Sequence, residues 1–174
     1  LGTGADISNV NFAGINNGPG TPFLNYNPAP NDGFYTDYTH TVTPANLVLG
    51  QTYPLSVTHS FTTATATTVY KRVYIDYNRD GDFEDANEEV FQSGVISNAA
   101  TNATTTESIT IPTDATLGLT RMRVICVAGN YNSPCGTYNF AGETEDYAVQ
   151  LASPFQNDVG FVSYVHPVGN VCPD

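Results

Sequence analysis

Apolar and polar residues alternate along most of this sequence, and no stretch has the spacing of an amphipathic helix. The clearest alternation covers residues 53–61. The large side chains at every second position there are Tyr53, Leu55, Val57, His59 and Phe61. Because successive side chains of a strand point to opposite faces of a sheet, these five would share one face. We therefore expect His59 to be a half-buried sheet residue and not a ligand.

The same period of two recurs in short segments that are separated by residues typical of turns. It predicts further strands over residues 5–13, 34–42, 67–77, 90–96, 107–111, 121–127 and 147–151. Within one of these segments, Met122, Val124 and Cys126 would point into the core. Short strands with turns between them are typical of an all-β chain, and we predict an antiparallel β-sandwich, Ig-like or jelly-roll-like.

The composition fits this fold class and restricts the function. The polar residues are mostly Thr, Asn, Ser and Asp, which favour strands and turns over helices. The 174 residues include 17 acidic and 5 basic side chains, a net charge of −12. This charge opposes binding to nucleic-acid phosphates and to anionic membranes. Since no apolar run approaches the ~20 residues of a membrane span, we expect a secreted or cell-surface protein without membrane insertion.

The sequence divides into two parts. We predict one sandwich domain over residues 1–152, and a linker with the first strand of a following Ig-like domain over residues 153–174. The alternative is that 155–174 adds a final strand to the same sandwich. Residues 14–33, rich in Gly, Asn and Pro, are predicted to form a long loop that could provide a partner surface. Because the chain begins with Leu1 and not Met, we expect it to be a portion of a longer protein.

The cysteines and histidines lack the spacing of a zinc site. They are scattered as Cys126, Cys135, Cys172, His40, His59 and His166. Cys126 and Cys135 enclose a short loop and could form a disulfide. The alternative is a buried free thiol at Cys126, because this residue alternates in step with apolar neighbours. Under the next-domain interpretation, Cys172 would have its partner outside the chain.

The stretch DYNRDGDFEDANE at residues 76–88 has the spacing of a calcium-binding loop. Oxygen-bearing side chains occupy positions 1, 3 and 5, and a glycine at position 6 allows the sharp turn that points alternate side chains inward. Position 12 of an EF-hand would be a glutamate, but here it is Asn87, and Glu88 follows one residue later. A predicted strand also precedes the loop. The pattern therefore favours a single calcium loop at the end of a β-strand over an EF-hand pair.

The predicted calcium ligands are the side chains of Asp76, Asn78, Asp80 and Glu88 and the carbonyl of Asp82, with Asp85 and Glu84 as further candidates. Without a cation, two carboxylates 4 Å apart repel each other by roughly 1 kcal/mol in water and by more when desolvated. Oxygen-only ligands favour Ca²⁺ over transition metals. Phe83 would anchor the loop in the core. The alternative is an acidic turn that binds no metal.

A second acidic patch, GETEDY at residues 142–147, precedes the last predicted strand. Its carboxylates could supply a distant metal ligand or pair with Arg121 and Arg123 on the neighbouring strand. The residue types alone favour the other interpretation, a solvated entrance to that strand.

These two patches together resemble the GEVED domain. The resemblance rests on YIDYNRDGDFEDANEEV at 74–90, TRMRV at 120–124 and PCGTYNFAGETEDYAVQL at 134–151, and it extends over roughly residues 5–151. The Gly-Glu-Val-Glu-Asp motif of the family is GETED here, with Thr144 in place of the valine. The resemblance implies an accessory β-sandwich module of large secreted or surface-attached bacterial proteins, especially of Bacteroidetes. Such modules accompany proteases, glycan-active modules, adhesin repeats and sorting domains for type IX secretion, and have no established catalytic site.

We therefore predict a non-catalytic, calcium-stabilised accessory or adhesive module, with neighbouring domains and a glycan or surface protein as its partners. No nucleophile or zinc-protease motif occurs, and the acidic residues cluster in one turn instead of facing each other across a cleft, so we predict no enzymatic activity. The alternative is a carbohydrate-binding module. Its sugar platforms would be Tyr26, Tyr35, Tyr38, Tyr131 and Tyr138, although the chain has no Trp.

Overall fold

The computed structural model describes residues 5–18, 34–61, 69–93, 102–128, 133–135 and 142–154. The predicted all-β class is confirmed, because these residues form ten strands and no helix. The strands are β1 (Ala5–Phe12), β2 (Ile15–Asn17), β3 (Phe34–Asp37), β4 (Ala45–Val48), β5 (Thr52–Phe61), β6 (Val69–Ile75), β7 (Glu89–Gln92), β8 (Asn102–Thr110), β9 (Gly118–Ala128) and β10 (Gly142–Ala152). In the part of the chain that is described, no helix is long and apolar enough to cross a membrane.

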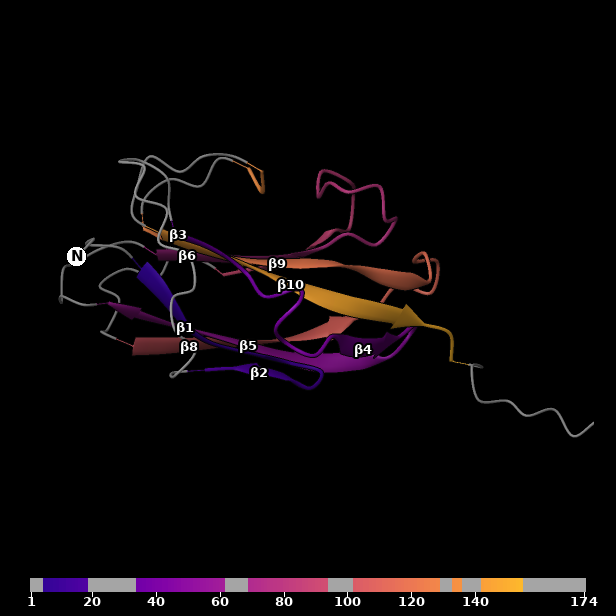
Figure 1. Cartoon of the computed structure of the whole chain (residues 1–174), viewed down its shortest axis with the longest axis horizontal. Helices are drawn as coiled ribbons and strands as arrows, with labels where there is room; N and C mark the ends of the chain where they lie inside the picture. Colours follow the sequence, from indigo (N-terminus) through magenta and orange to yellow (C-terminus); the bar gives the residue numbers. More distant parts are fainter. Residues whose placement is uncertain are drawn as a thin grey trace, which may run out of the picture.

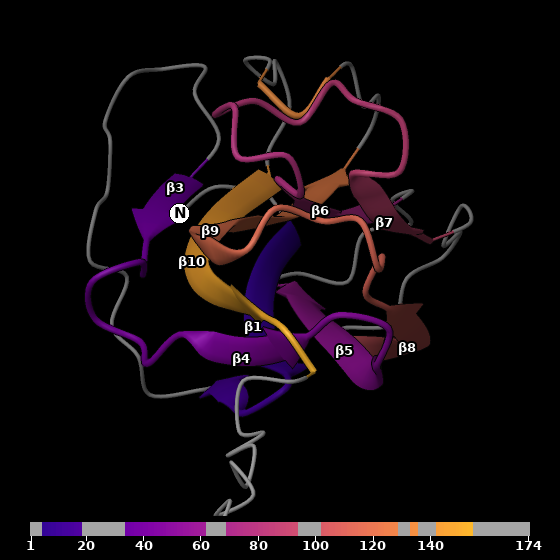
Figure 2. The ribbon, with the colours of Figure 1, turned by 90° about the vertical axis from the view of Figure 1, so that its right-hand side faces the viewer.

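The ten strands belong to a single sheet, ordered β7-β6-β9-β10-β1-β5-β8. β2 pairs with β1, and β3 and β4 pair with β10. Figure 1 shows that the sheet folds over on itself, so that β6 and β9 lie in one layer while β5 and β8 lie in the other. Viewed from the end in Figure 2, the strands curl around the core from β7 to β8. The layers of this sandwich-like fold are therefore two parts of one continuous sheet.

The pairing is mixed, so the predicted wholly antiparallel arrangement is wrong. β9 runs antiparallel to both β6 and β10. On its other edge, β10 runs parallel to β3 over its first half, to β4 over its second half, and to β1 at Gly142. Alternation of side chains is the same in parallel and antiparallel strands, so the sequence pattern could not distinguish the two. Strand β10 is buried along most of its length, as expected for a strand with neighbours on both edges.

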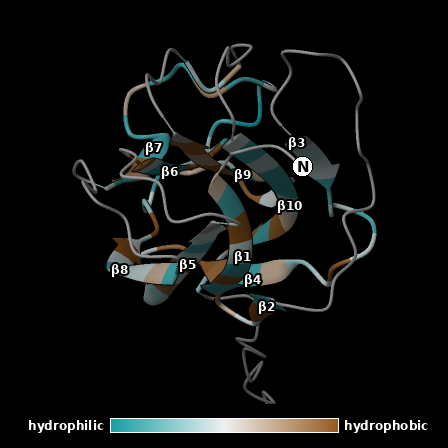
Figure 3. Cartoon of the chain, turned by 90° about the vertical axis from the view of Figure 1, so that its left-hand side faces the viewer, coloured by the Kyte–Doolittle hydropathy of each residue, from teal (hydrophilic) through white to brown (hydrophobic). Residues whose placement is uncertain are grey.

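The core lies between the two layers and consists of side chains at alternate strand positions. Figure 3 shows brown bands alternating with paler ones along the strands. Members from four strands are Phe12, Leu55, Val57, Val73, Ile75, Met122, Val124 and Cys126. His59 shares the inward face of β5, as predicted, but it is 0% exposed and not half-buried. A second, smaller cluster combines Tyr74, Phe83, Ile125 and Val127.

Several element boundaries differ from those predicted. β2 lies at the start of the predicted 14–33 loop, and β4 lies where only a turn was expected. β10 begins at Gly142 and not at Tyr147, so the second acidic patch is part of the strand. The sequence pattern did not reveal where β10 begins, because the first residues of the strand are polar. Most of the groups that they bond to come from distant parts of the chain. Residues 19–33 and the predicted next-domain segment 155–174 lie outside the described residues.

Candidate metal site

The acidic loop, residues 76–88, connects β6 to β7 and is closed at its base by backbone hydrogen bonds. Ile75 N donates to Glu88 O at 2.9 Å, and Asp76 N donates to Arg121 O of β9 at 3.1 Å. Gly81 has a φ of 97°, which confirms that the predicted turn residue adopts a left-handed conformation. Arg79 and Asn87 also have positive φ values, 64° and 79°. The loop is therefore a tightly wound segment fixed to two strands.

The first half of the loop folds around its own side-chain oxygens. The Asp76 carboxylate accepts hydrogen bonds from Arg79 N at 2.6 Å and Gly81 N at 3.2 Å. Asn78 Oδ1 accepts from Asp80 N at 2.9 Å, and Asp80 Oδ1 accepts from Asp82 N at 3.2 Å. Such bonds to a backbone N–H two residues onward are typical of Asx-turns. The alternating acidic and amide residues thus shape the loop before any ion is considered.

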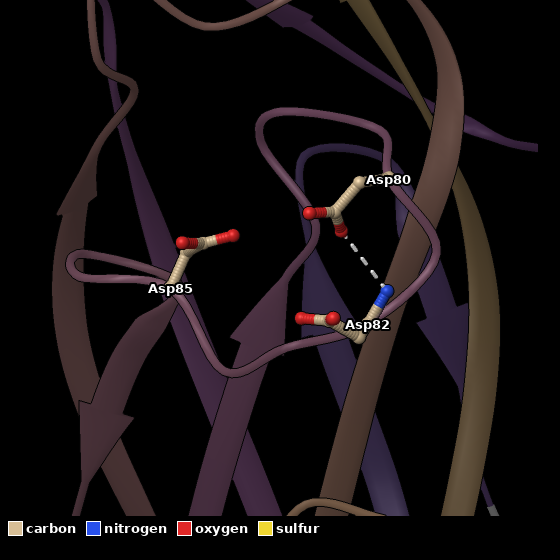
Figure 4. Close-up of side chains that lie close together, drawn as sticks. All are labelled: Asp80, Asp82 and Asp85. Atoms are coloured by element: carbon tan, nitrogen blue, oxygen red, sulfur yellow. Dashed lines mark hydrogen bonds between the residues drawn. The ribbon is translucent and has the colours of Figure 1, made fainter.

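Three aspartates of the loop bring their carboxylates together at its surface. Oxygens of Asp80, Asp82 and Asp85 all lie within 4.8 Å of one another, and all three residues are exposed. Figure 4 shows the Asp85 side chain pointing across the loop toward the other two. Hydrogen bonds, first of all from the backbone of Asp82, hold the pKa of Asp80 below its usual value. The group can hold a hard divalent cation through oxygen ligands.

Asn78 occupies the space between two of these aspartates. Its Nδ2 donates to Asp80 Oδ2 at 2.9 Å and to Asp85 Oδ2 at 2.6 Å. The partial positive charge of this amide offsets part of the repulsion between the two carboxylates. The predicted ligand Asn78 is therefore beside the cluster, but it faces the two aspartates with nitrogen and not with oxygen.

The two remaining predicted ligands, Asp76 and Glu88, are buried and lie outside the three-aspartate group. The Asp76 carboxylate accepts the backbone hydrogen bonds of the turn described above. Glu88 Oε1 accepts from Tyr77 N at 2.9 Å and from Asn78 N at 3.5 Å, whereas its Oε2 has no hydrogen-bond partner among the described residues. Burial raises the pKa of the Glu88 carboxyl above its usual value. Asp82 joins the group through its carboxylate, a ligand atom that the sequence analysis had not assigned to it.

Phe83 anchors the loop, as predicted, but in the second cluster and not in the main core. Its ring packs 5.9 Å from that of Tyr74. The guanidinium of Arg123 lies over the Phe83 ring at 5.2 Å and over the Tyr35 ring at 5.8 Å. Arg123 therefore connects the acidic loop to the acidic patch of β10.

The patch on β10 is buried, so the predicted solvated strand entrance is wrong. Asp146 is 0% exposed and accepts from Arg123 Nε at 2.7 Å and Nη2 at 2.8 Å. Arg121 lies 3.3 Å from the same carboxylate, and the Tyr35 hydroxyl donates to it at 2.8 Å. The other interpretation, a partner for the two arginines of β9, is the correct one.

Two glutamates of the patch point the opposite way, into the core. Glu143 accepts the backbone N–H of Ile7 in β1 at 2.5 Å. Glu145 accepts from the Tyr147 hydroxyl at 2.6 Å, and that hydroxyl accepts from Asn17 Nδ2 at 2.7 Å. Burial raises the pKa of Glu143 to about 7 and that of Glu145 to about 8. These carboxyls join strands and do not form a surface site.

The remaining sequence predictions concern the cysteines. Cys126 is a buried free thiol, and Cys135 is exposed and free, so the 126–135 disulfide is absent and the alternative is confirmed. Cys172 lies outside the described residues. At Gly142 a Cβ would lie 2.6 Å from Cys126 O and 2.9 Å from Val127 Cα. Only glycine fits at this first position of the motif, because β9 passes too close.

The fold and the two acidic segments define the class of protein: an all-β module whose exposed acidic loop is fixed to a buried acidic strand. Residues 70–150 match the model of the GEVED domain family, and this part of the chain is a GEVED domain. The match begins in β6 and ends in β10, so it includes both acidic segments. It covers the second part of the longer region over which the sequence resembles the family.

The solved structures that are similar to this chain are distant in sequence. The CARDB domain of a Pyrococcus furiosus protein, solved in complex with di-metal ions, is 13% identical, with a TM-score of 0.39 over 63% of this chain and 81% of that chain. A family 123 glycoside hydrolase from Clostridium perfringens is 15% identical, with a TM-score of 0.42 over 62% of this chain and only 22% of that chain. A Niemann-Pick type C2 protein from the Japanese carpenter ant is 4% identical, with a TM-score of 0.40 over 85% and 92% of the two chains. No curated protein matches the chain.

Proposed function

We propose that the chain is a non-catalytic accessory module of a secreted or cell-surface multidomain protein, stabilised by calcium at its acidic loop. The observation that supports the calcium site best is the convergence of Asp80, Asp82 and Asp85 at the loop surface. Three carboxylates so close together repel one another, and a divalent cation converts this repulsion into attraction. Calcium accepts six to eight oxygen ligands in flexible geometry, which suits a loop site completed by water.

Calcium would be held by the three aspartates, with Asn78 as a fourth ligand. The Asn78 side chain already contacts two of the aspartates, and rotation of its amide would present oxygen in place of nitrogen. Because the loop is bonded to β6, β7 and β9, an ion bound there would stabilise the strands as well as the loop. Binding to the folded state alone adds about 2.7 kcal/mol at a hundredfold excess over Kd.

The accessory role is supported by the way the other acidic residues are used. Asp146, Glu143 and Glu145 each have a hydrogen-bond partner within the fold, which supports a structural use of these acidic residues. GEVED domains are found in extracellular proteins, and this supports a secreted or surface location. The module would act as a rigid spacer or adhesive element between neighbouring domains of its parent protein.

Thermal unfolding in EDTA and across a calcium titration tests the proposal. The melting temperature of the whole chain should rise by roughly 5–10 °C at saturation, and magnesium should reproduce this poorly. The double variant D80N/D82N should lose the response. Glu107→Gln, which removes one carboxylate at an exposed position of β8, should retain it. An equal calcium response in D80N/D82N and in the wild type would refute the site.

A carbohydrate-binding role is the second candidate, and it rests on Tyr35. Of the five tyrosines considered as sugar platforms, Tyr35 is 38% exposed, whereas Tyr38 is buried and stacks on Tyr147 at 5.4 Å. The others, Tyr26, Tyr131 and Tyr138, lie outside the described residues. A glycan-array screen with wild type and Tyr35→Ala would test this role, and binding unaffected by the substitution would exclude Tyr35 as the platform.

A further inference from the structure

Two exposed leucines, Leu117 and Leu119, flank Gly118 at the start of β9. They are 48% and 54% exposed, and the only other large apolar side chain that is exposed in the described part of the chain is Tyr35. A single exposed leucine is ordinary, but neighbouring ones form an apolar surface that gains free energy when another apolar group covers it. We call residues 117–119 the leucine ridge and treat it as a candidate contact surface.

The backbone of the leucine ridge is held by the acidic loop. The guanidinium of Arg79, a loop residue, donates from Nη1 to Leu117 O at 2.9 Å and from Nε to Leu119 O at 3.1 Å. On either side of the ridge, Thr116 N and Thr120 Oγ1 donate to carbonyls at the start of the loop, both at 2.8 Å. Four hydrogen bonds therefore make the position of the ridge depend on the conformation of the loop.

The leucine ridge also lies beside the place where the chain leaves the last strand. In the register of β9 with β10, Gly118 is opposite Leu151, and β10 ends one residue later at Ala152. Figure 1 shows the end of the β10 arrow beside the start of β9. The described residues continue to Pro154. Because an extended chain spans about 3.3 Å or more per residue, the segment from residue 155 onward begins within reach of the ridge.

The segment at residues 155–165, FQNDVGFVSYV, has the composition to cover the leucine ridge. Its only charged residue is Asp158, and it has six apolar or aromatic residues. They are Phe155, Val159, Phe161, Val162, Tyr164 and Val165. Because the segment is joined to the chain beside the ridge, its effective concentration there is high. A second copy of the chain would instead have to approach against a net charge of −12 on each molecule. The segment is therefore the favoured occupant.

We propose that the leucine ridge is the docking surface for residues 155–165, and that Arg79 links this contact to the acidic loop. The docking itself needs no ion. Its response to calcium rests on the proposed calcium site, because an ion that orders the loop also orders Arg79 and the two carbonyls that it binds. The domain then sets the direction in which the chain continues, as a spacer between neighbouring domains requires.

Fluorescence quenching measures the docking. The chain has no Trp, so Phe161→Trp places a single indole in the segment, and acrylamide quenching in EDTA reports how well it is covered. Adding L117S/L119S should raise the quenching constant roughly twofold or more, because the undocked state becomes the major one. Tyr35→Ala removes the other exposed large apolar side chain and should leave the constant unchanged. An equal constant with and without L117S/L119S would overturn the docking. A constant that falls as the protein concentration rises would also overturn it, since a second copy would then cover the indole.

A calcium titration of the same F161W chain tests the link through Arg79. Saturating calcium should lower the quenching constant below its value in EDTA. Arg79→Ala should abolish this decrease while the melting temperature still rises with calcium, because the Arg79 side chain is not one of the three carboxylates. A rise in melting temperature with no change in quenching would overturn the link and leave the docking intact. If calcium changes neither quantity, the proposed calcium site fails, and the comparison in EDTA still decides the docking.

Discussion

The acidic loop and the acidic strand of this domain have similar residues but opposite environments. In residues 76–88 the aspartates bond to backbone N–H groups a few residues away, and three of their side chains remain at the surface. In residues 142–146 each acidic side chain is buried against a partner within the fold: Glu143 and Asp146 bond to other strands, and Glu145 bonds to Tyr147 of β10 itself. A carboxylate with a dedicated buried partner holds the fold together, whereas a group of exposed carboxylates is available to a ligand. The experiments below test this contrast, beginning with the largest expected effect.

Asp146→Asn should be the most destabilising of these changes. The substitution preserves size but removes the charge that neutralises Arg123, whose side chain is only 15% exposed. Breaking a buried ion pair from one side costs about 3–5 kcal/mol, and we expect a value near the lower limit because Arg123 retains some contact with water. Urea denaturation measures the loss, with Glu107→Gln as the exposed control. Identical urea midpoints for D146N and the wild type would show that the ion pair between Asp146 and Arg123 contributes nothing to the free energy of unfolding.

The stability of the fold should decrease as the pH rises, because of the two buried glutamates. Their folded pKa values, about 7 for Glu143 and about 8 for Glu145, lie above the ordinary value of 4.5. The folded state therefore retains protons that the unfolded chain releases above about pH 4.5, and this contribution is lost as the pH passes through 7 and 8. We expect the free energy of unfolding to fall by several kcal/mol between acidic and mildly alkaline pH, because one pKa unit corresponds to about 1.4 kcal/mol. Glu145→Gln should flatten the upper part of the curve, and an unaltered slope in that variant would contradict the assignment.

Replacing a glycine by alanine should also change the stability of the fold by different amounts in the two regions. Gly142→Ala places a methyl group 2.6 Å from a backbone oxygen of β9, so we expect a loss of about 1–3 kcal/mol from overpacking. A Cβ at Gly81 would meet nothing within 4 Å, and only the φ of 97° opposes it, at a cost of about 1–2 kcal/mol. Thermal melts of the two variants in EDTA should place G142A below G81A. The reverse order would show that strain in the loop exceeds crowding in the strand.

The smallest effect is expected for D80N/D82N in EDTA. Without calcium, these exposed carboxylates repel each other and Asp85, and an asparagine Oδ1 can still accept the backbone hydrogen bonds that Asp80 and Asp82 accept. The substitution should therefore leave the melting temperature equal to or slightly above that of the wild type. Differential scanning fluorimetry in low salt is sensitive enough for this comparison. A clear fall in the melting temperature without calcium would mean that the aspartates stabilise the loop through their turn hydrogen bonds alone.

Much of the loop could be predicted from the sequence, whereas little of the strand could. The spacing of Asp76, Asn78, Asp80 and Gly81 led to the correct turn, because the bonds that shape it join residues two to five positions apart. The same spacing did not show that Glu88 lies outside the three-aspartate group or that the carboxylate of Asp82 belongs to it. A side chain's final orientation depends on what packs beneath the loop. In β10, acidic residues were taken for a solvated entrance because their partners are remote in sequence. Ile7, for example, lies 136 residues from Glu143.

The sequence alone determined the all-β class, the positions of most strands and the existence of the acidic loop, because each depends on periodicity or on bonds between near neighbours. The tertiary structure decided the rest. It placed β3 and β4 parallel to β10, and it enclosed Glu143, Glu145 and Asp146. The physical reason is that burial and charge pairing depend on which segments meet in space. Hydrophobic alternation specifies that a strand has a buried face, but not which strands it will lie beside.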